Sequence, residues 1–311
     1  MILVLGEALI DLVLHPSGAL QALEGGGPYN AARTIARLGQ PAMFLAAISD
    51  DRFGRGLLRQ LRDDGVDLSA VVETNRPTTL AVAELDRDGS ATYRFYFEGT
   101  SAPALEPAVA VSRLRAGVRA FHVGTLGLVF EPMATAAQEV LDSLDPDTLI
   151  FVDPNCRPLV ITDPDSYRER IRAVCRKADV VKVSEEDLEY LFPGVDTDSA
   201  ARRFITDGAQ VVLLSAGSSG VRVLHGEGSL SVPAAKVTVV DTIGAGDSLG
   251  GGFLAWWIAR GYGRAELRDL ALLRQAAEFA VYVAGRTCAV AGAQPPHLAS
   301  LPAALQDELS P

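Results

Sequence analysis

Positive charge is scarce in this sequence. Its 311 residues include 28 Lys and Arg against 39 Asp and Glu, which gives a formal net charge of −11. A field of that sign repels nucleic acid and anionic membranes, so we expect neither as a partner. An anionic ligand would have to be held by local backbone amides and a few arginines.

Paired cysteines and long apolar runs are also missing. The three cysteines, Cys156, Cys175 and Cys288, form no CxxC or Cys/His pair, which argues against a zinc site or a disulfide framework. We expect reduced thiols in a cytoplasmic protein. No apolar run approaches the ~18 residues of a membrane helix. The N-terminal run MILVLGEALIDLVLH carries Glu7 and Asp11 without a basic leader, which is typical of a strand rather than a signal peptide.

Short apolar runs alternate with helical patterns along the chain. The runs are almost continuously apolar, as expected for parallel strands that are covered on both faces. This alternation predicts one domain over residues 1–311, a three-layer α/β/α sandwich with a mainly parallel sheet. The expected strands cover residues 2–6, 42–49, 120–124, 148–153, 179–184 and 210–217, and the expected helices lie near 28–38, 53–65, 131–144, 164–178, 185–192 and 198–207.

One region breaks this alternation. The β-rich runs TTLAVAELD (78–86) and SATYRFYFE (90–98) are joined by Arg87-Asp88-Gly89, which is typical of a hairpin turn. Their period-2 pattern predicts a sheet with one exposed face. We expect a small β lid formed by segments near 9–23 and 77–100; an ordinary edge hairpin on the main sheet is the alternative.

The second run gives the hairpin two different faces. Alternation places Tyr93 and Phe95 on one face, and Arg94 and Tyr96 on the other. One face could cover a ligand while the other packs against the lid of a second chain, which predicts a homodimer. A hairpin packed only on its own domain is the alternative.

Glycines and two aspartates cluster in DTIGAGDSLGGGF (241–253). The stretch lacks the lysine of a P-loop, and Leu249 stands where GxGxxG requires glycine. It follows the strand-like run AKVTVV (235–240) and enters an apolar helix, so the amides of Gly244, Ala245 and Gly246 should form an anion-binding nest. Asp247 could then accept the proton of a hydroxyl that attacks a phosphoryl group. An aspartate that only caps its own helix is the alternative.

The stretch DTIGAGD (241–247) resembles the C-terminal signature of the ribokinase-like (PfkB) carbohydrate kinases, with Asp247 at the position of the family's catalytic base. GGGPYNAA (25–32) resembles the second signature of that family. Further matches follow in order along the whole chain: GEALIDLV (6–13), SDDRFG (49–54), PTTLA (77–81), DPNCRP (153–158), KVSEED (182–187) and SAGSSG (215–220). The resemblance implies a ribokinase-like fold with a β lid and ATP-dependent phosphorylation of the primary hydroxyl of a small sugar, with Mg²⁺.

The resemblance also implies which residues bind the sugar. It places Asp11, Gly26, Gly27 and Asn30 around it, although Asn30 could instead cap the helix that follows.

A second group of ligand contacts is expected from DPNCRP. This motif follows an expected strand, so Asp153, Asn155 and Arg157 should face a cleft at the C-terminal end of the sheet. Arg157 would meet phosphate oxygens through its planar fork, or form a structural ion pair with Asp153.

The nucleotide and metal positions are implied in the same way. Lys182, Ser184, Ser215, Gly217 and Gly220 fall at the nucleotide positions, although SAGSSG is also compatible with a plain turn. Asp187 would order Mg²⁺-bound water; the family often has Asn and Glu where this chain has Ser184 and Asp187, and a capping box is compatible with that role. A monovalent cation such as K⁺ would be held by carbonyls of Asp241 and Ile243 and by the segment around Gly292.

The motif D-P-N-x-R is typical of fructokinase-like and 2-keto-3-deoxygluconate kinase-like members. We expect fructose as the sugar, with 2-keto-3-deoxygluconate, whose carboxylate would require an arginine such as Arg94, and ribose or a nucleoside as alternatives. A sensor that binds sugar or nucleotide without turnover would not require Asp247. A dinucleotide-dependent oxidoreductase lacks its fingerprint, because residues 6–11 are GEALID.

Overall fold

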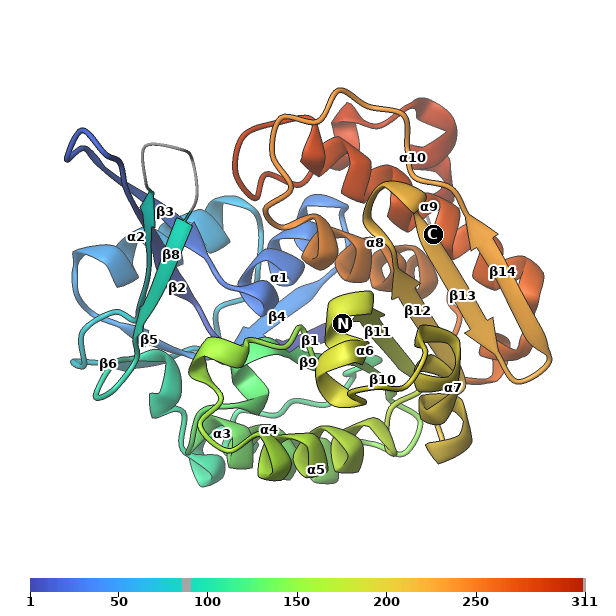
Figure 1. Cartoon of the computed structure of the whole chain (residues 1–311), viewed down its shortest axis with the longest axis horizontal. Coiled ribbons are helices and arrows are strands. Elements are labelled where there is room, and N and C mark those ends of the chain that lie inside the picture. Colours follow the sequence, from blue (N-terminus) through green and yellow to red (C-terminus); the bar gives the residue numbers. More distant parts are fainter. Residues whose placement is uncertain (86–90, 310–311) are drawn as a thin grey trace.

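The computed structural model describes residues 1–85 and 91–309 and has an eight-stranded sheet at its centre (Figure 1). Six neighbouring strands run parallel, and the last two form an antiparallel edge hairpin. The order across the sheet is β14 (Gly228–Val232), β13 (Val221–His225), β12 (Val211–Ser215), β11 (Val180–Ser184), β10 (Leu149–Asp153), β9 (Ala120–Gly124), β1 (Ile2–Leu5) and β4 (Ala42–Leu45).

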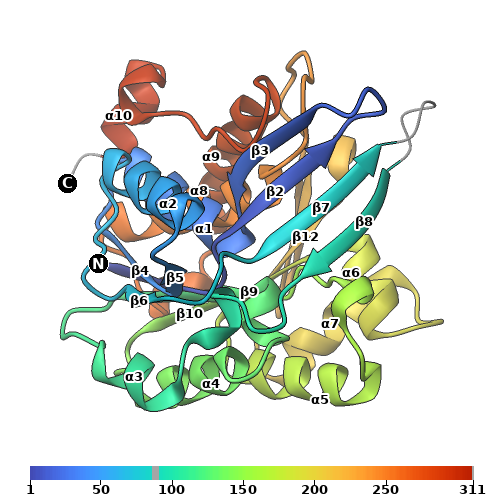
Figure 2. The same ribbon diagram turned by 90° about the vertical axis from the view of Figure 1, so that its left-hand side faces the viewer.

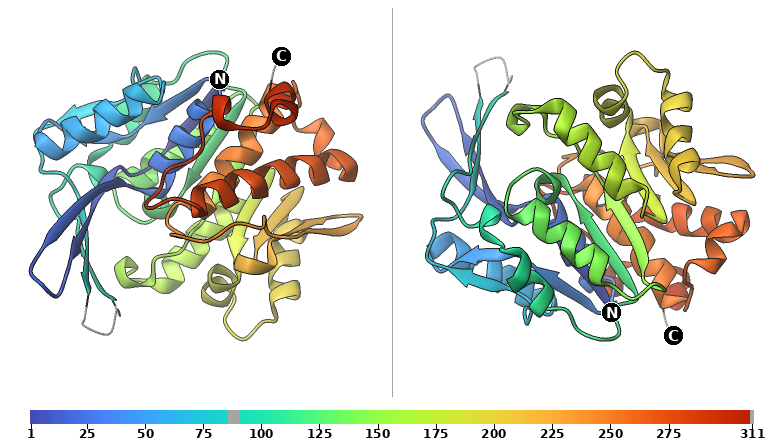
Figure 3. Two further views of the ribbon diagram at one scale, coloured as in Figure 1. Left: turned by 90° about the horizontal axis from the view of Figure 1, so that it is seen from above. Right: turned by 90° about the horizontal axis from the view of Figure 1, so that it is seen from below.

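Helices cover both faces of this sheet, as the views from above and below show (Figure 3). Alternation along β1 sends Leu3 and Leu5 into one hydrophobic core and Ile2 and Val4 into the other. The first core includes α3 (Pro107–Ser112), α4 (Met133–Ser143), α5 (Pro164–Cys175), α6 (Glu185–Leu191) and α7 (Thr197–Asp207). The second includes α1 (Gly27–Arg37), α2 (Arg52–Asp63), α8 (Ala245–Ala259), α9 (Leu270–Cys288) and α10 (Ala303–Leu309). The predicted three-layer sandwich is therefore confirmed.

A separate four-stranded sheet stands beside the sandwich (Figure 2). Its strand order is β3 (Leu20–Gly25), β2 (Leu9–Leu14), β7 (Leu80–Leu85) and β8 (Ala91–Tyr96). Because none of these strands pairs with the main sheet, the alternative of an edge hairpin on that sheet is wrong. The expected turn at Arg87-Asp88-Gly89 lies outside the described residues. We call these four strands the lid sheet.

Two expectations about strands need correction. The run expected at 42–49 is broken, and its second half, β5 (Ala47–Ser49), leaves the main sheet to pair with β6 (Val72–Thr74). The run at 235–240 forms no strand, although it contains four valines or threonines. Val239 and Val240 are 61% and 60% exposed, so nothing rewards their preference for a sheet.

No helix among residues 1–85 and 91–309 is long and apolar enough to cross a membrane.

The two tryptophans lie in the core that contains α8. Trp256 and Trp257 are fully buried, and their indole N–H groups donate to Glu308 and to the Gly263 carbonyl, respectively. These contacts agree with the requirement that a buried indole find a hydrogen-bond partner.

A buried ion-pair network ties α1 to the end of α2 and to a C-terminal loop. Asp64 accepts from Arg33 Nε at 2.6 Å and from Arg37 Nε at 2.7 Å, and the Arg33 side chain is 0% exposed. Arg33 also donates to the Ala293 carbonyl at 2.9 Å. The network holds α1 in place.

Asp64→Asn should destabilise the fold, because it leaves two guanidinium groups without their anion. We expect the free energy of unfolding to fall by about 3 kcal/mol, as for other broken buried pairs. Urea denaturation followed by circular dichroism measures this. Asp63→Asn, at the neighbouring exposed position, is the matched control. Equal stability of the two variants would show that the network contributes nothing.

Candidate active site

A cavity of about 670 Å³ lies between the lid sheet and the C-terminal ends of the main-sheet strands. Apolar side chains of β2, β3, β7 and β8 form one wall. The starts of α1 and α8 and the segments after β1, β9 and β10 form the other. The polar side chains that line it are Glu7, Asp11, Asn30, Thr125, Asn155, Arg157, Lys182, Thr242 and Asp247.

A left-handed glycine opens α8 at this cavity. Gly244 has φ 75° and ψ 4°, as required at the third position of a type II turn. The turn is closed by the Ala245 amide, which donates to the Thr242 carbonyl at 3.2 Å. The expectation of three free amides is therefore wrong for Ala245. In the described part of the chain, the amides of Gly246 and Asp247 have no backbone or side-chain partner, and both residues line the cavity.

Asp247 is buried at the start of α8, where its Oδ2 accepts a hydrogen bond from Asn30 Nδ2 at 2.9 Å. Burial raises its pKa, while the Asn30 amide and the positive charges of Lys182 and Arg157 act in the opposite direction. A carboxylate whose pKa is nearer neutrality is a better general base for a hydroxyl. Since the helix is preceded by Gly244 and Asp247 instead bonds to α1, the alternative of a helix cap is not supported.

The contact between Asn30 and Asp247 depends on the close packing of α1 and α8. A Cβ atom at Gly251 would lie 2.8 Å from Thr34 Cβ and 3.0 Å from the Ala31 carbonyl oxygen. Only glycine allows the helices to approach this closely. Asn30 lies inside α1, whose N-cap is Gly26, so the alternative that Asn30 caps this helix is wrong.

Two acidic side chains near the N-terminus line the same cavity. Burial raises the pKa of Asp11, in β2, to about 6, and the Asp247 carboxylate adds to the rise. Glu7, which follows β1, is 1% exposed, and burial raises its pKa to about 8. The sequence analysis assigned Asp11 to the site and missed Glu7. The available signal was an acidic residue within an apolar run, directly after Gly6.

The segments after β9 and β10 meet through two residues with left-handed backbone. Thr125 has φ 50° and Asn155 has φ 40°, which is costly for residues other than glycine. Asn155 Nδ2 donates to Thr125 Oγ1 at 3.2 Å, and Arg157 donates to Asn155 Oδ1 at 2.7 Å. The structure thus brings Asn155 and Arg157 to the cavity, as predicted. Thr125 was not identified from the sequence.

A buried ion pair lies beside the start of α8. Lys182 Nζ, in β11, is 3.0 Å from Asp153 Oδ2. The alternative that Asp153 forms an ion pair with Arg157 is therefore wrong, because Lys182 is its partner. Burial lowers the pKa of Lys182, but Asp153, Asp187 and Asp247 outweigh it and the net pKa is raised. A Cβ atom at Gly246 would lie 2.9 Å from Nζ. Lys182 therefore holds a fixed positive charge directly beside the first turn of α8.

Asp187 and Ser184 form the capping box of α6. Ser184 Oγ accepts from the Asp187 amide at 3.1 Å, and Asp187 Oδ2 accepts from the Ser184 amide at 2.8 Å. Asp187 Oδ1 accepts from the Cys156 amide at 2.7 Å. Within residues 1–85 and 91–309, no three His, Cys, Asp or Glu side chains gather as a metal site would require.

The expected nucleotide residues at the end of β12 are not among those that line the cavity. Ser215 Oγ donates to the Val183 carbonyl at 3.3 Å. Gly217 lies in the 3₁₀ turn Gly217–Ser219, and Gly220 has φ 93°. A Cβ atom at Gly220 would lie 2.1 Å from the Val232 carbonyl oxygen, so packing alone requires this glycine.

The three positions expected around a monovalent cation do come together. Asp241 Oδ1 accepts from the Ile243 amide at 3.0 Å, and Oδ2 accepts from the Gly292 amide at 2.8 Å. The Asp241 side chain thereby joins the segment before α8 to the loop after α9.

The lid sheet presents the two faces that alternation predicted. Tyr93 and Phe95 line the cavity. Arg94 is not among the lining residues; it lies on the other face, 60% exposed, and pairs with Glu84 at 3.0 Å. The prediction that Arg94 contacts the substrate is therefore not supported by this arrangement, because residues adjacent in a strand point to opposite faces.

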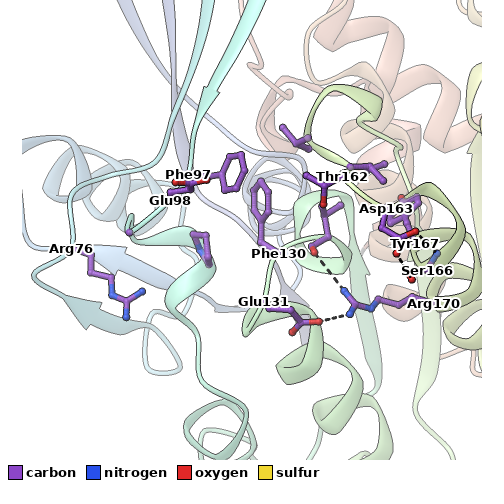
Figure 4. A pocket seen from close by; sticks show the side chains of 15 residues that line it. Arg76, Phe97, Glu98, Phe130, Glu131, Thr162, Asp163, Ser166, Tyr167 and Arg170 are labelled. Atoms are coloured by element: carbon purple, nitrogen blue, oxygen red, sulfur yellow. Dashed lines mark hydrogen bonds and ion pairs between the residues drawn. The ribbon is translucent and has the colours of Figure 1, made fainter.

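A second cavity, of about 430 Å³, lies between residues 97–99, which follow β8, and helix α5 (Figure 4). Phe97 and Phe130 stack within it with ring centroids 4.2 Å apart. Arg170 is held by Glu131 and by the carbonyls of Leu128 and Val129.

Comparisons with known proteins match nearly the whole chain. A family model described as pfkB family carbohydrate kinase matches residues 1–299. A fructokinase of Rhizobium leguminosarum bv. trifolii is 36% identical over 259 residues, which cover 82% of this chain and 79% of the relative.

Solved structures share the whole fold. A fructokinase with bound ATP from Xylella fastidiosa superposes with a TM-score of 0.84 at 25% identity, covering 94% of this chain and 93% of the other. An aminoimidazole riboside kinase from Salmonella enterica, complexed with aminoimidazole riboside and an ATP analogue, gives a TM-score of 0.81 at 25% identity and covers 99% of both chains.

Gly27→Ala tests whether the larger cavity is the binding site. The added Cβ would lie 2.6 Å from Thr125 Oγ1 and 3.2 Å from Asp247 Oδ1. We expect fructose affinity, measured by calorimetry, to fall at least about tenfold, while the free energy of unfolding falls by only about 1–2 kcal/mol. Gly228→Ala, where a Cβ meets nothing within 4 Å, is the control. Unchanged fructose affinity in Gly27→Ala would place the ligand elsewhere.

Proposed function

Since the chain belongs to the pfkB family of carbohydrate kinases, as its motifs predict, we propose that it transfers the γ-phosphoryl group of ATP to the primary hydroxyl of fructose. The observation that carries this proposal is Asp247. It is a buried carboxylate beside two free amides, in a cavity lined by further carboxyl and amide groups.

The arrangement suits phosphoryl transfer, which depends mainly on positioning and charge stabilisation. Asp247 Oδ1 accepts the proton of the attacking hydroxyl, while Asn30 holds Oδ2. The amides of Gly246 and Asp247 and the charges of Lys182 and Arg157 face the negative charge of the transferred group. The lid sheet covers the sugar side of the cavity and excludes water.

The charges of the cavity favour a neutral sugar. Among its described lining residues, the only Lys and Arg are Lys182, which is paired with Asp153, and Arg157. The carboxylate of 2-keto-3-deoxygluconate would need a further cation, and Arg94 lies on the far face of the lid sheet. A riboside remains the second candidate, because an aminoimidazole riboside kinase shares the fold over 99% of both chains.

We propose that Mg²⁺ accompanies ATP and supplies charge neutralisation of the phosphates, with Asp187 ordering its water. Asp187 accepts three hydrogen bonds from the chain, and a carboxylate offers about four acceptor positions, so one remains for a water molecule. Direct coordination of Mg²⁺ by the Asp187 carboxylate fits less well, because its other acceptor positions are occupied. We also propose that carbonyls of Asp241 and Ile243 and the segment around Gly292 hold K⁺, since the Asp241 side chain keeps these segments together.

Homodimerisation through the lid sheet and a cytoplasmic location also belong to this proposal. The outer face of β8, an edge strand, exposes Arg94 and Tyr96, and an unpaired edge with an exposed aromatic side chain suits a second copy. Cys156, Cys175 and Cys288 are free thiols, as expected in a reducing compartment.

Asp247→Asn should lower kcat about 10²- to 10⁴-fold, because the amide cannot accept the hydroxyl proton. ADP release with Mg-ATP should be measured across fructose, 2-keto-3-deoxygluconate, ribose, adenosine, tagatose 6-phosphate and fructose 1-phosphate. Asp145→Asn, in an exposed loop, is the control. Saturable sugar binding without ADP release by the wild type would instead indicate a sensor.

Tyr96→Glu should convert a lid-mediated dimer to a monomer, because it places a charge in the interface. Sedimentation velocity gives the result directly. Val109→Glu, at an exposed apolar position of α3, should leave the dimer intact. A monomeric wild type, or a Tyr96→Glu variant that stays dimeric, would rule out this interface.

A further inference from the structure

Glu7 connects the first strand to the glycine turn that begins α1. It follows β1, its side chain lines the larger cavity, and it is 1% exposed. Glu7 Oε1 accepts a hydrogen bond from the Gly27 amide at 3.0 Å. One carboxyl oxygen therefore fixes the position of Gly27, at the start of α1.

The other oxygen, Glu7 Oε2, is buried and has no hydrogen-bond partner in the described part of the chain. A buried polar atom without a partner is costly, so such an atom in a binding cavity indicates a contact that a ligand completes. The same holds for Asn30 Oδ1, whose amide nitrogen is already bonded to Asp247.

Burial first, and then the charges around Glu7, decide which form of the carboxyl group is present. Asp11 from β2 and Asp247 from α8 are the acidic groups of the cavity, and Arg157 and Lys182 are the basic ones. Burial raises the pKa of Glu7 to about 8; its own backbone and the Gly27 amide lower it, Asp247 raises it and Arg157 lowers it. With a pKa of about 8, the carboxylic acid is the major form at neutral pH. Because Oε1 accepts from the Gly27 amide, the proton of that form belongs on Oε2, which is then a donor.

We propose that Glu7 is a specificity-determining residue that donates a hydrogen bond from Oε2–H to a hydroxyl oxygen of the bound sugar. This inference rests on the proposed sugar kinase function and deepens it. Glu7 complements the carboxylates of the cavity, because an ionised Asp11 or Asp247 can only accept.

The pairing fits the chemistry of a sugar hydroxyl, which donates one hydrogen bond and accepts others. Asp11, Asp247 and Asn30 Oδ1 offer acceptors for hydroxyl protons, while Glu7 offers a donor for hydroxyl oxygens. An uncharged acid also adds no negative charge beside Asp247 or the incoming phosphate. A site built to bond a hydroxyl rejects an analogue that lacks it, because its own polar groups are then left unpaired.

The test compares Glu7→Gln, which keeps a neutral donor and an acceptor, with Glu7→Met, which has a similar size and neither. Glu73→Gln, on the exposed edge of β6, is the matched control. The KM values for the sugar and for ATP should be measured from about pH 6 to about pH 9.5, on either side of the raised pKa. Sugar affinities of the same proteins, measured by calorimetry without ATP, give the result independently of turnover.

In the wild type, KM for the sugar should rise above about pH 8, as Glu7 ionises and loses its donor. Glu7→Gln should stay within about threefold of the wild type at neutral pH and lack this alkaline rise. Glu7→Met should raise KM for the sugar about tenfold at every pH and leave KM for ATP within about twofold. Glu73→Gln should follow the wild type throughout.

Two results would overturn the inference. If Glu7→Gln lost as much sugar affinity as Glu7→Met, the sugar would be bound by a carboxylate acceptor. If Glu7→Met kept its sugar affinity, Glu7 would not contact the sugar, and its role would be limited to accepting the hydrogen bond of the Gly27 amide. Should Glu7→Met fail to fold by circular dichroism, the pH profile of Glu7→Gln decides alone. A wild type that binds sugar but phosphorylates none would refute the proposed function, whereas the calorimetric order of the variants would still decide the role of Glu7.

Discussion

The close packing of α1 on α8 is the constraint on which the site depends. One helix follows the N-terminal strands and the other lies more than two hundred residues later. Gly251 lets their backbones approach, and Asn30 and Asp247 then meet at 2.9 Å. The buried network of Arg33 and Asp64 holds α1 from its other side. Because the proposed general base and a proposed sugar-binding residue share this contact, a shift of either helix would disturb both.

The electrostatics of the site oppose those of the whole molecule. The chain carries a formal net charge of −11, yet it must bind the phosphates of ATP. Lys182 and the amides of Gly246 and Asp247 supply local positive potential where the main-sheet strands end. Burial raises the pKa of Glu7 to about 8, so this carboxyl group adds little negative charge to the cavity at neutral pH.

The order of strands and helices was predictable because each parallel strand is a nearly continuous apolar run, such as residues 149–153 in β10. The run at 235–240 has a similar β-branched and apolar composition and was wrongly predicted to be strand-like. Val239 and Val240 are exposed there, since no neighbouring strand pairs with them. The free amide expected at Ala245 failed for another reason: the turn around Gly244 uses it internally.

By itself the sequence determined the layered architecture, the lid segments and the glycine turn before Asp247, because periodicity and glycine turns are local properties. Asp11 was indicated by the resemblance of its motif to the pfkB family, and Asn155 and Arg157 by their place after an expected strand. Tertiary structure alone decided which polar groups became buried together. In the folded chain Glu7 lines the cavity and Asp153 forms an ion pair with Lys182. Arg94 lies on the opposite face of the lid sheet from the cavity. Burial and pairing depend on which distant segments pack against one another. The pKa values and the unpartnered atoms that define the chemistry of the site follow from that packing.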